Sequence, residues 1–169
     1  FSGSGSVQTG TIEAKGDIRT TGTNGGTATV LLDTAGDQTI TSTSANYSMP
    51  TLTINKPSGT VSVASPGFNT DAFTLQSGTF SVGSANFGDD GAFTISGGTY
   101  DAGTGTTTFS GSSSSVIDVL TTQTFNNLAF SNNLTKTISS GDTLVVNGLL
   151  LFSGSGSVQT GTIEAKGDI

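Results

Sequence analysis

The aspartates are the residues of this chain best equipped for chemistry, because it contains no histidine and no cysteine. Asp89 and Asp90 are adjacent, Asp71 precedes them, and Asp101 and Asp118 follow. Stacked carboxylates and turn carbonyls suit Ca²⁺, which takes about six to eight oxygen ligands. The glycine-rich nonapeptide of calcium-binding β-rolls is absent. We therefore expect ordinary turn aspartates and no cofactor, with Ca²⁺ on Asp71, Asp89, Asp90 and Asp101 as the alternative.

Paired carboxylates can also cleave glycosidic bonds, which makes Asp89, Asp90 and Asp101 a candidate hydrolytic set. The chain has no tryptophan to form a sugar platform, and its phenylalanines fall on positions expected to be internal. Without histidine or cysteine there is no Ser-His or Cys-His nucleophile pair, no thiolate or imidazole zinc site and no disulfide. We predict that the chain is not an enzyme. A polysaccharide lyase or hydrolase that depends on Asp90 is the rival from the enzyme class.

The amino-acid composition excludes some fold classes and some binding partners. Gly, Ser and Thr make up 80 of the 169 residues, and the good helix formers are scarce, which excludes an all-α fold. The net charge of −7 has the wrong sign for binding a phosphate backbone, so nucleic acid is excluded as a partner. No apolar run approaches the length of a membrane span. The chain also begins without a basic and apolar leader, which indicates a mature or excerpted piece.

A long repeat determines the domain organisation. Residues 1–18 read FSGSGSVQTGTIEAKGDI, and residues 152–169 repeat the same eighteen letters at an offset of 151. We interpret residues 1–151 as one full period and residues 152–169 as the start of the next identical period of a tandem array. That interpretation predicts Arg-Thr-Thr-Gly after Ile169. An engineered or circularised chain with duplicated ends is the alternative.

A shorter repeat lies inside the period. Leu52-Thr-Ile54, Phe73-Thr-Leu75 and Phe93-Thr-Ile95 follow one another at a nearly constant spacing, and each precedes a second alternating stretch. The same pattern recurs more loosely at Leu128-Ala-Phe130 and Leu150-Leu-Phe152. Alternation of apolar residues with Thr or Ser is typical of strands with one buried face, and the intervening Gly, Asn and Asp clusters supply turns. About seven such units fit into one period.

Similarity between equivalent positions favours a solenoid over a sandwich or barrel. In a solenoid the residue one coil ahead occupies the same place in the cross-section, so matching residues should resemble each other. We therefore predict an all-β fold, a parallel β-helix (β-solenoid) of about seven coils of roughly 20–22 residues per period. The predicted inner ladder consists of Leu52, Ile54, Val61, Phe73, Leu75, Phe80, Phe93, Ile95, Tyr100, Leu128, Phe130, Leu150 and Phe152.

Three segments resemble repeats of large secreted bacterial surface proteins, namely 124–130 (TFNNLAF), 52–55 (LTIN) and 141–151 (GDTLVVNGLLL). The resemblance covers Tyr47–Phe152 and is to filamentous-haemagglutinin-type adhesins and autotransporter stalks. It implies a right-handed parallel β-helix, an extracellular or cell-surface location, and a stalk, adhesive or matrix role. It identifies no ligand.

The function expected from these observations is structural. We predict an extracellular filament or stalk whose main partner is itself, through covalent repeats or end-to-end stacking of coils. The alternative is a binding function, in which the protein is an adhesin that recognises glycans or surfaces through its outer face. Neither nucleic-acid binding nor membrane insertion is expected.

Overall fold

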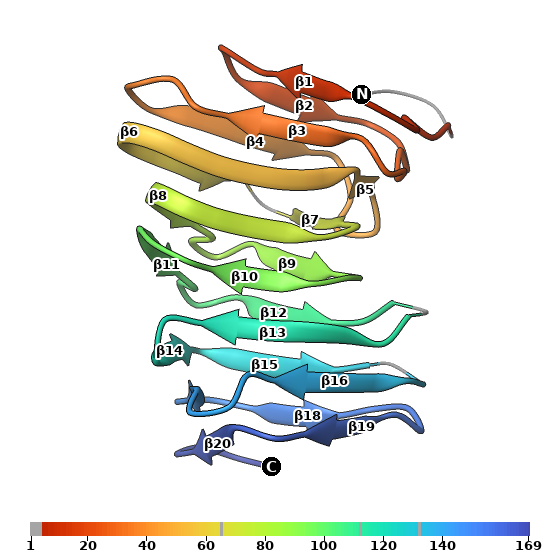
Figure 1. Cartoon of the computed structure of the whole chain (residues 1–169), viewed down its shortest axis with the longest axis vertical. Coiled ribbons are helices and arrows are strands. Elements are labelled where there is room, and N and C mark those ends of the chain that lie inside the picture. The colour runs from red at the N-terminus through yellow and green to blue at the C-terminus, as the bar shows by residue number, and fades with distance from the viewer. Residues whose placement is uncertain (1–4, 65, 112, 132) are drawn as a thin grey trace.

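The computed structural model describes residues 5–64, 66–111, 113–131 and 133–169. Throughout these ranges the chain forms strands and turns without any helix, and the strands wind into a stack of about seven turns (Figure 1). No helix long and apolar enough to cross a membrane occurs in the part of the chain that the structure describes. The predicted fold class, an all-β parallel solenoid, is confirmed.

The strands are short and follow one another around each coil. Their bounds are β1 Thr11–Glu13, β2 Ile18–Thr20, β3 Thr29–Leu32, β4 Gln38–Ser42, β5 Ser48–Met49, β6 Thr51–Val63, β7 Gly67–Thr70, β8 Phe73–Ser81, β9 Asn86–Asp89, β10 Phe93–Ile95, β11 Thr99–Asp101, β12 Thr106–Phe109, β13 Ser115–Val119, β14 Thr122–Phe125, β15 Asn127–Phe130, β16 Thr135–Ile138, β17 Thr143–Val146, β18 Leu150–Phe152, β19 Ser157–Gln159 and β20 Thr162–Ala165.

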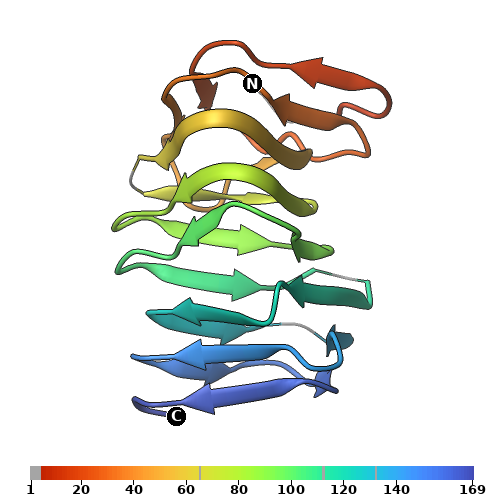
Figure 2. The same cartoon turned by 60° about the vertical axis from the view of Figure 1, so that its left-hand side comes forward.

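These strands form three parallel sheets that run along the axis of the stack. The eleven-strand sheet has the main order β1-β3-β6-β8-β10-β13-β16-β19 and a second column, β2-β4-β6-β8-β11. The six-strand sheet has the order β18-β15-β12-β9-β7-β5, and the three-strand sheet has the order β14-β17-β20. The long strands β6 and β8 belong to both columns and arch around the coil (Figure 2).

Registers between coils show which residues are equivalent. Leu52 pairs with Phe73, and Phe73 pairs with Phe93, in agreement with their regular spacing in the sequence. Coil length varies more than expected, from the short coil between Thr11 and Thr29 to the long coil between Phe93 and Ile117. The pairing of β6 with β8 shifts register between Ile54 and Thr60, and the other strand pairs each keep one register, so there the variation is taken up between the strands.

The core is a continuous column of apolar side chains inside the coils. Alternation appears directly in β3 and β4, where every second side chain is buried. The rings of Phe73 and Phe93 stack with centroids 5.1 Å apart, so aromatic contacts run along the axis from coil to coil. Twelve of the thirteen residues of the predicted ladder are buried: Leu52, Ile54, Val61, Phe73, Leu75, Phe80, Phe93, Ile95, Tyr100, Leu128, Phe130 and Leu150.

The expected equivalence of Leu128 with the Leu52 position is wrong. After Phe93, the ladder of the eleven-strand sheet continues to Ile117, whereas Leu128 lies in the six-strand sheet, between Thr107 and Leu150. All faces of a solenoid bury alternate residues, so alternation alone does not tell which face a strand belongs to.

Phe152 also departs from the prediction, because its side chain is 53% exposed. Its ring stacks on Phe130, with centroids 5.3 Å apart and planes 9° from parallel. Phe152 belongs to β18, at the edge of the six-strand sheet, and β15 is the only strand paired with β18 among the described residues. One face of the ring is therefore packed and the other is uncovered.

The two copies of the eighteen-letter segment occupy different places in the coil. In the first copy, Thr11–Glu13 pairs with β3 in the eleven-strand sheet. In the second copy, the same letters at Thr162–Glu164 belong to β20 and pair with β17 in the three-strand sheet. Within the described ranges each copy has a neighbouring coil on one side only, so different neighbours determine the two placements.

Two turn glycines show how closely the coils approach. Gly67 (φ +107°) and Gly103 (φ +59°) adopt backbone conformations that residues with a Cβ rarely take. A Cβ at Gly67 would collide with the carbonyl oxygen of Asn86, and one at Gly103 with that of Gly83. Both carbonyls belong to the adjacent coil. Glycine at these turns therefore permits stacking at the spacing of hydrogen-bonded strands.

Candidate functional site

The structure gathers three of the five candidate aspartates at one corner of the coil. Thr70 pairs with Asp89, which places Asp71 and Asp90 one above the other where the six-strand sheet ends. The Asp71 carboxylate accepts a hydrogen bond of 2.5 Å from the backbone N–H of Gly26, and Asp90 accepts one of 2.5 Å from the Ser110 hydroxyl. Asp90 thus serves as a turn residue that links successive coils, whereas Asp71 links two coils that have a third coil between them.

Asp101 and Asp118 lie elsewhere. Asp101 is exposed on β11, where its carboxylate accepts hydrogen bonds from the Ser81 hydroxyl, at 2.8 Å, and from the Gly103 N–H, at 3.1 Å. Asp118 is exposed on β13, beside Thr94 of the previous coil. The candidate hydrolytic set is therefore divided, since Asp89 is buried and Asp101 lies on a separate strand at the surface.

Asp89 is the unusual member of the corner. Its side chain points inward and has no exposed surface, and neither carboxylate oxygen has a partner at full hydrogen-bonding geometry among the described residues, although the Gly91 N–H lies close enough to lower its pKa. Burial raises the pKa of this carboxyl to about 7, an effect that Lys136 opposes and the charges of Asp90 and Asp71 reinforce. A buried carboxyl without such partners is rare in folded proteins, because desolvation of its charged form is costly.

Lys136 is the second buried ionisable group at this corner. Its side chain has no exposed surface, and its Nζ donates to the Ser115 hydroxyl at 2.7 Å. Nζ also lies 3.4 Å from the carbonyl oxygen of Gly91 and 3.5 Å from that of Asp90. Burial lowers the pKa of Lys136, and the charges of Asp89 and Asp90 partly offset this effect.

A second buried lysine lies nearer the first coil. Lys56 is 1% exposed and donates to the Gln38 side-chain oxygen at 2.6 Å. Gln38 in turn donates to the carbonyl oxygens of Ala14 and Gly16, at 2.9 and 2.7 Å. Unlike Asp89, this internal polar group is connected to its neighbours by hydrogen bonds.

Sequence reasoning missed both buried lysines, although the alternation pattern contained a signal for one of them. In Thr135-Lys136-Thr137-Ile138, Lys136 has the same parity as Ile138, and both point inward. A lysine in phase with apolar residues is expected to be internal or to reach a partner. Lys56 lies where the pairing of β6 with β8 changes register, so simple alternation does not apply there.

Three of the four aspartates suggested as Ca²⁺ ligands, Asp71, Asp89 and Asp90, lie at this corner of the coil. Within the described ranges no group of three acidic side chains is arranged to hold a metal ion. At the corner of Asp71, Asp89 and Asp90, the positive charge comes instead from the Lys136 ammonium, which contacts two turn carbonyls. Those backbone oxygens are the kind of ligand that a calcium ion would need.

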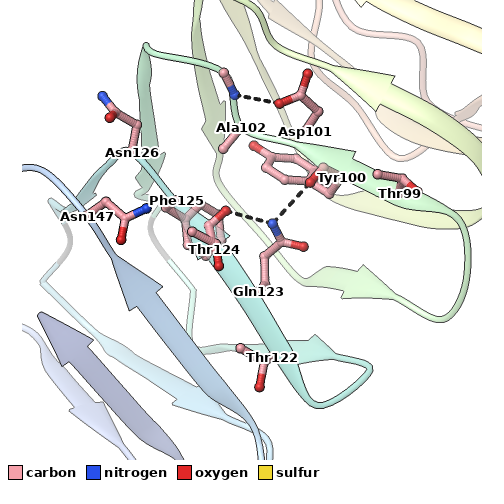
Figure 3. A pocket seen from close by; sticks show the side chains of 11 residues that line it. Thr99, Tyr100, Asp101, Ala102, Thr122, Gln123, Thr124, Phe125, Asn126 and Asn147 are labelled. Carbon is pink, nitrogen blue, oxygen red and sulfur yellow. Dashed lines mark hydrogen bonds between the residues drawn. The ribbon is translucent and has the colours of Figure 1, made fainter. Parts of the chain in front are cut away.

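The outer surface carries a polar pocket of about 530 Å³ (Figure 3). It lies between β11 and β14, which are on successive coils but are not paired with each other. β11 pairs with β8 of the preceding coil, and β14 pairs with β17 of the following coil. Gln123 donates to the carbonyl oxygens of Tyr100, at 3.1 Å, and Thr124, at 2.8 Å. Tyr100, Ala102, Gly103 and Phe125 form part of the lining. The rest consists of hydroxyl and amide groups with the Asp101 carboxylate at one side: Thr99, Asp101, Thr122, Gln123, Thr124, Asn126 and Asn147.

The fold defines the class of this protein as a parallel β-solenoid whose apolar interior also encloses Lys56, Lys136 and Asp89. Comparison with protein-family models, with curated proteins and with solved structures finds no match to the chain. Its function must therefore be inferred from its own geometry.

Proposed function

We propose that this chain is a segment of an extracellular structural rod, a filament or stalk built by continuing the same stack of coils. The observation that carries the proposal is the uninterrupted column of buried side chains, in which Leu52, Phe73 and Phe93 lie over one another. Each coil in such a stack depends on its neighbours for burial and for strand pairing, which is the energetic arrangement of a repeat protein.

The ends of the stack support continuation. Strands β1, β19 and β20 each have one paired neighbour among the described residues, and their other edges carry no further strand. Strand β18 also has one paired strand, but its Leu150 N–H donates to the carbonyl oxygen of Asp168 at 2.9 Å. On the last coil, Leu149, Leu151 and Phe152 are exposed at 45%, 44% and 53%. Open strand edges with exposed apolar residues favour pairing with a further coil. The repeated segment supplies a sequence that can begin such a coil.

The length of longer chains tests the proposal. Chains of one, two and three 151-residue periods should give rods whose length grows by about 34 Å per period, from seven coils at strand spacing. Small-angle scattering measures the cross-section and the length separately. We expect a constant cross-section and a linear increase in length. Two- and three-period chains that behave as flexibly linked globules would contradict a continuous rod.

The 169-residue chain, which contains one full period and also Phe152, serves as the control for non-covalent assembly. Sedimentation at increasing concentration shows whether separate chains stack end to end. Replacing Phe152 with lysine places a charge on the uncovered edge and should reduce stacking between chains. The length of covalently joined periods is then measured under conditions in which single chains do not associate.

The pocket between β11 and β14 supports one second candidate, an adhesin that binds neutral glycans. Its hydroxyl and amide groups can donate and accept hydrogen bonds with sugar hydroxyls, as polar groups in ligand sites do. A glycan array probed with the purified protein tests this function. Binding that is lost in Asn147→Ala and retained in Asn55→Ala, which lies outside the lining, would support it. Absence of any bound glycan would leave the rod as a passive spacer.

A further inference from the structure

The interior near β9 and β16 contains two buried ionisable groups, a lysine that donates hydrogen bonds and a carboxyl that does not accept one from it. Asp89 and Lys136 are both completely buried, and both carboxylate oxygens of Asp89 lack partners at full hydrogen-bonding geometry within the described chain. An isolated buried charge is strongly unfavourable, and natural proteins pair or neutralise such groups. A buried carboxyl near a buried amine can be neutralised by a covalent bond between the two.

The two side chains approach the same short segment of backbone. Lys136 Nζ contacts the carbonyl oxygens of Asp90 and Gly91, the two residues that directly follow Asp89. The lysine side chain reaches these atoms past Ser115, which belongs to the coil in between. The ion pairs within 4.0 Å among the described residues involve Lys15 and Lys166 instead. Lys136 and Asp89 are therefore neighbours in the core without a direct ion pair.

We propose that Lys136 and Asp89 are the site of an internal amide cross-link, formed between Nζ of the lysine and Cγ of the aspartate. The lone pair of the neutral amine attacks Cγ of the protonated acid, and a new N–C bond forms. The C–OH bond then breaks, and the hydroxyl leaves as water with one of the two Nζ protons. The other proton stays on the amide nitrogen, so the step balances without an oxidant or any further reactant.

The surroundings favour the reactive forms of both groups. Burial raises the pKa of Asp89 to about 7, so a large fraction of the carboxyl is protonated near neutrality. Burial also lowers the pKa of Lys136, which increases the fraction of neutral amine. The absence of exposed surface keeps bulk water away from the product. An amide would replace two ionisable groups in the core by one neutral group.

The cross-link would join coils that are not adjacent. Asp89 precedes β10, β10 pairs with β13, and β13 pairs with the strand that carries Lys136. The bond therefore spans two coil steps and closes the loop of chain between positions 89 and 136. Covalent closure of a loop restricts the unfolded chain, and in a stack held by neighbour contacts it also prevents these coils from separating.

The intact mass of the denatured protein tests the proposal. We expect the unmodified sequence to give a mass one water lighter than its composition, and both Asp89→Ala and Lys136→Met to give the full mass of their sequences. Trypsin should cleave after Lys136 only where its amine is free. The cross-linked protein should therefore remain uncut at this position after denaturation. Fragmentation of the resulting peptide should place the bond between residues 89 and 136.

Two controls separate this bond from other causes of water loss. Lys56→Met removes the other buried lysine and should retain the loss. The Asp90-Gly91 sequence can lose water by closing a succinimide on its own backbone, which does not require a lysine. A loss that persists in Lys136→Met reports that ring and overturns the proposal. Full mass and trypsin cleavage at Lys136 in the unmodified sequence overturn it as well, whether or not the variants fold.

Discussion

Ile12 and Ile163 are the same position of the duplicated segment, yet Ile12 lies beside Val30 in the eleven-strand sheet and Ile163 lies beside Leu144 in the three-strand sheet. Identical letters therefore adopt the same strand conformation on two different faces of the coil. Local sequence determines that the segment is extended, and the neighbouring coil determines which face it joins. A continuous periodic array would require each copy to have neighbours on both sides.

Engineered disulfides test these two placements, and the absence of native cysteine makes the readout unambiguous. Thr11 and Thr29 are register partners, as are Thr143 and Thr162. Adjacent strands bring such Cα atoms within disulfide range. We expect both double-cysteine variants to form an intramolecular bond under mild oxidation, measured by mobility and mass. The pair Thr11→Cys with Thr143→Cys is the control and should stay reduced. Failure of a register pair to oxidise would contradict the placement of that copy.

Two phenylalanines should differ in their contribution to stability. Phe73 is fully buried and contacts several rings, so Phe73→Ala should lower the free energy of unfolding by about 3–5 kcal/mol. Phe152 is half exposed and, of the aromatic rings that the structure describes, packs on Phe130 alone, so Phe152→Ala should cost about 1 kcal/mol. Urea unfolding followed by circular dichroism measures both. Equal costs would contradict the described difference in burial.

Two glycines with positive φ form a matched pair. Gly36 (φ +85°) has open space around an added Cβ, so Gly36→Ala should cost about 1–2 kcal/mol of backbone strain. Gly67→Ala meets the same kind of strain and also the Asn86 carbonyl, which should add about 1–3 kcal/mol. Thermal unfolding of the two variants measures the difference. A smaller loss for Gly67→Ala would contradict the close approach of the coils at this turn.

The pH dependence of stability should reveal Asp89 in the Lys136→Met variant. Without the lysine this carboxyl is free, and burial together with the negative charges of Asp90 and Asp71 holds its pKa above the ordinary value. The folded state then binds a proton more tightly than the unfolded state. Removing Lys136 also removes the charge that lowers this pKa, so stability should fall as pH rises from about 4 to above about 7, by up to about 1.4 kcal/mol per pH unit.

Urea midpoints of Lys136→Met at about pH 5 and about pH 8 measure this slope. The matched control is Asp89→Asn combined with Lys136→Met, in which the titrating group is absent. Subtracting its pH dependence removes the contribution of the other carboxyls. A Lys136→Met variant that follows its control at every pH would show that Asp89 is not the group responsible.

The sequence was sufficient to predict the fold class because each of its main patterns depends only on nearby residues or on the spacing of one coil. Alternation marks strands, glycine marks turns, and Leu52, Phe73 and Phe93 recur at the spacing of one coil. The face that each strand joins was less accessible, as the assignment of Leu128 shows. That choice depends on turn length, and the coil from Phe93 to Ile117 is longer than its predecessors.

The candidate site was only partly predictable. The adjacency of Asp89 and Asp90 drew attention to the right corner, but alternation on β9 does not by itself show that Asp89 points inward, since three successive residues of this strand are buried. Lys136 approaches that corner from two coils away, much later in the chain. Which residues meet across two coils depends on the lengths of all the turns between them. The spacing of residues within one coil does not determine this.

The missing pairing between β11 and β14 has a mechanical consequence. The other coils on this face of the stack are joined by hydrogen bonds between paired strands. Between β11 and β14, the side chains of Gln123 and Asn126 donate instead to the carbonyl oxygens of Tyr100 and Thr104. Under tension along the axis, extension should therefore begin at this level, before the fully paired levels yield. A rod of many periods would repeat this compliant joint in each period.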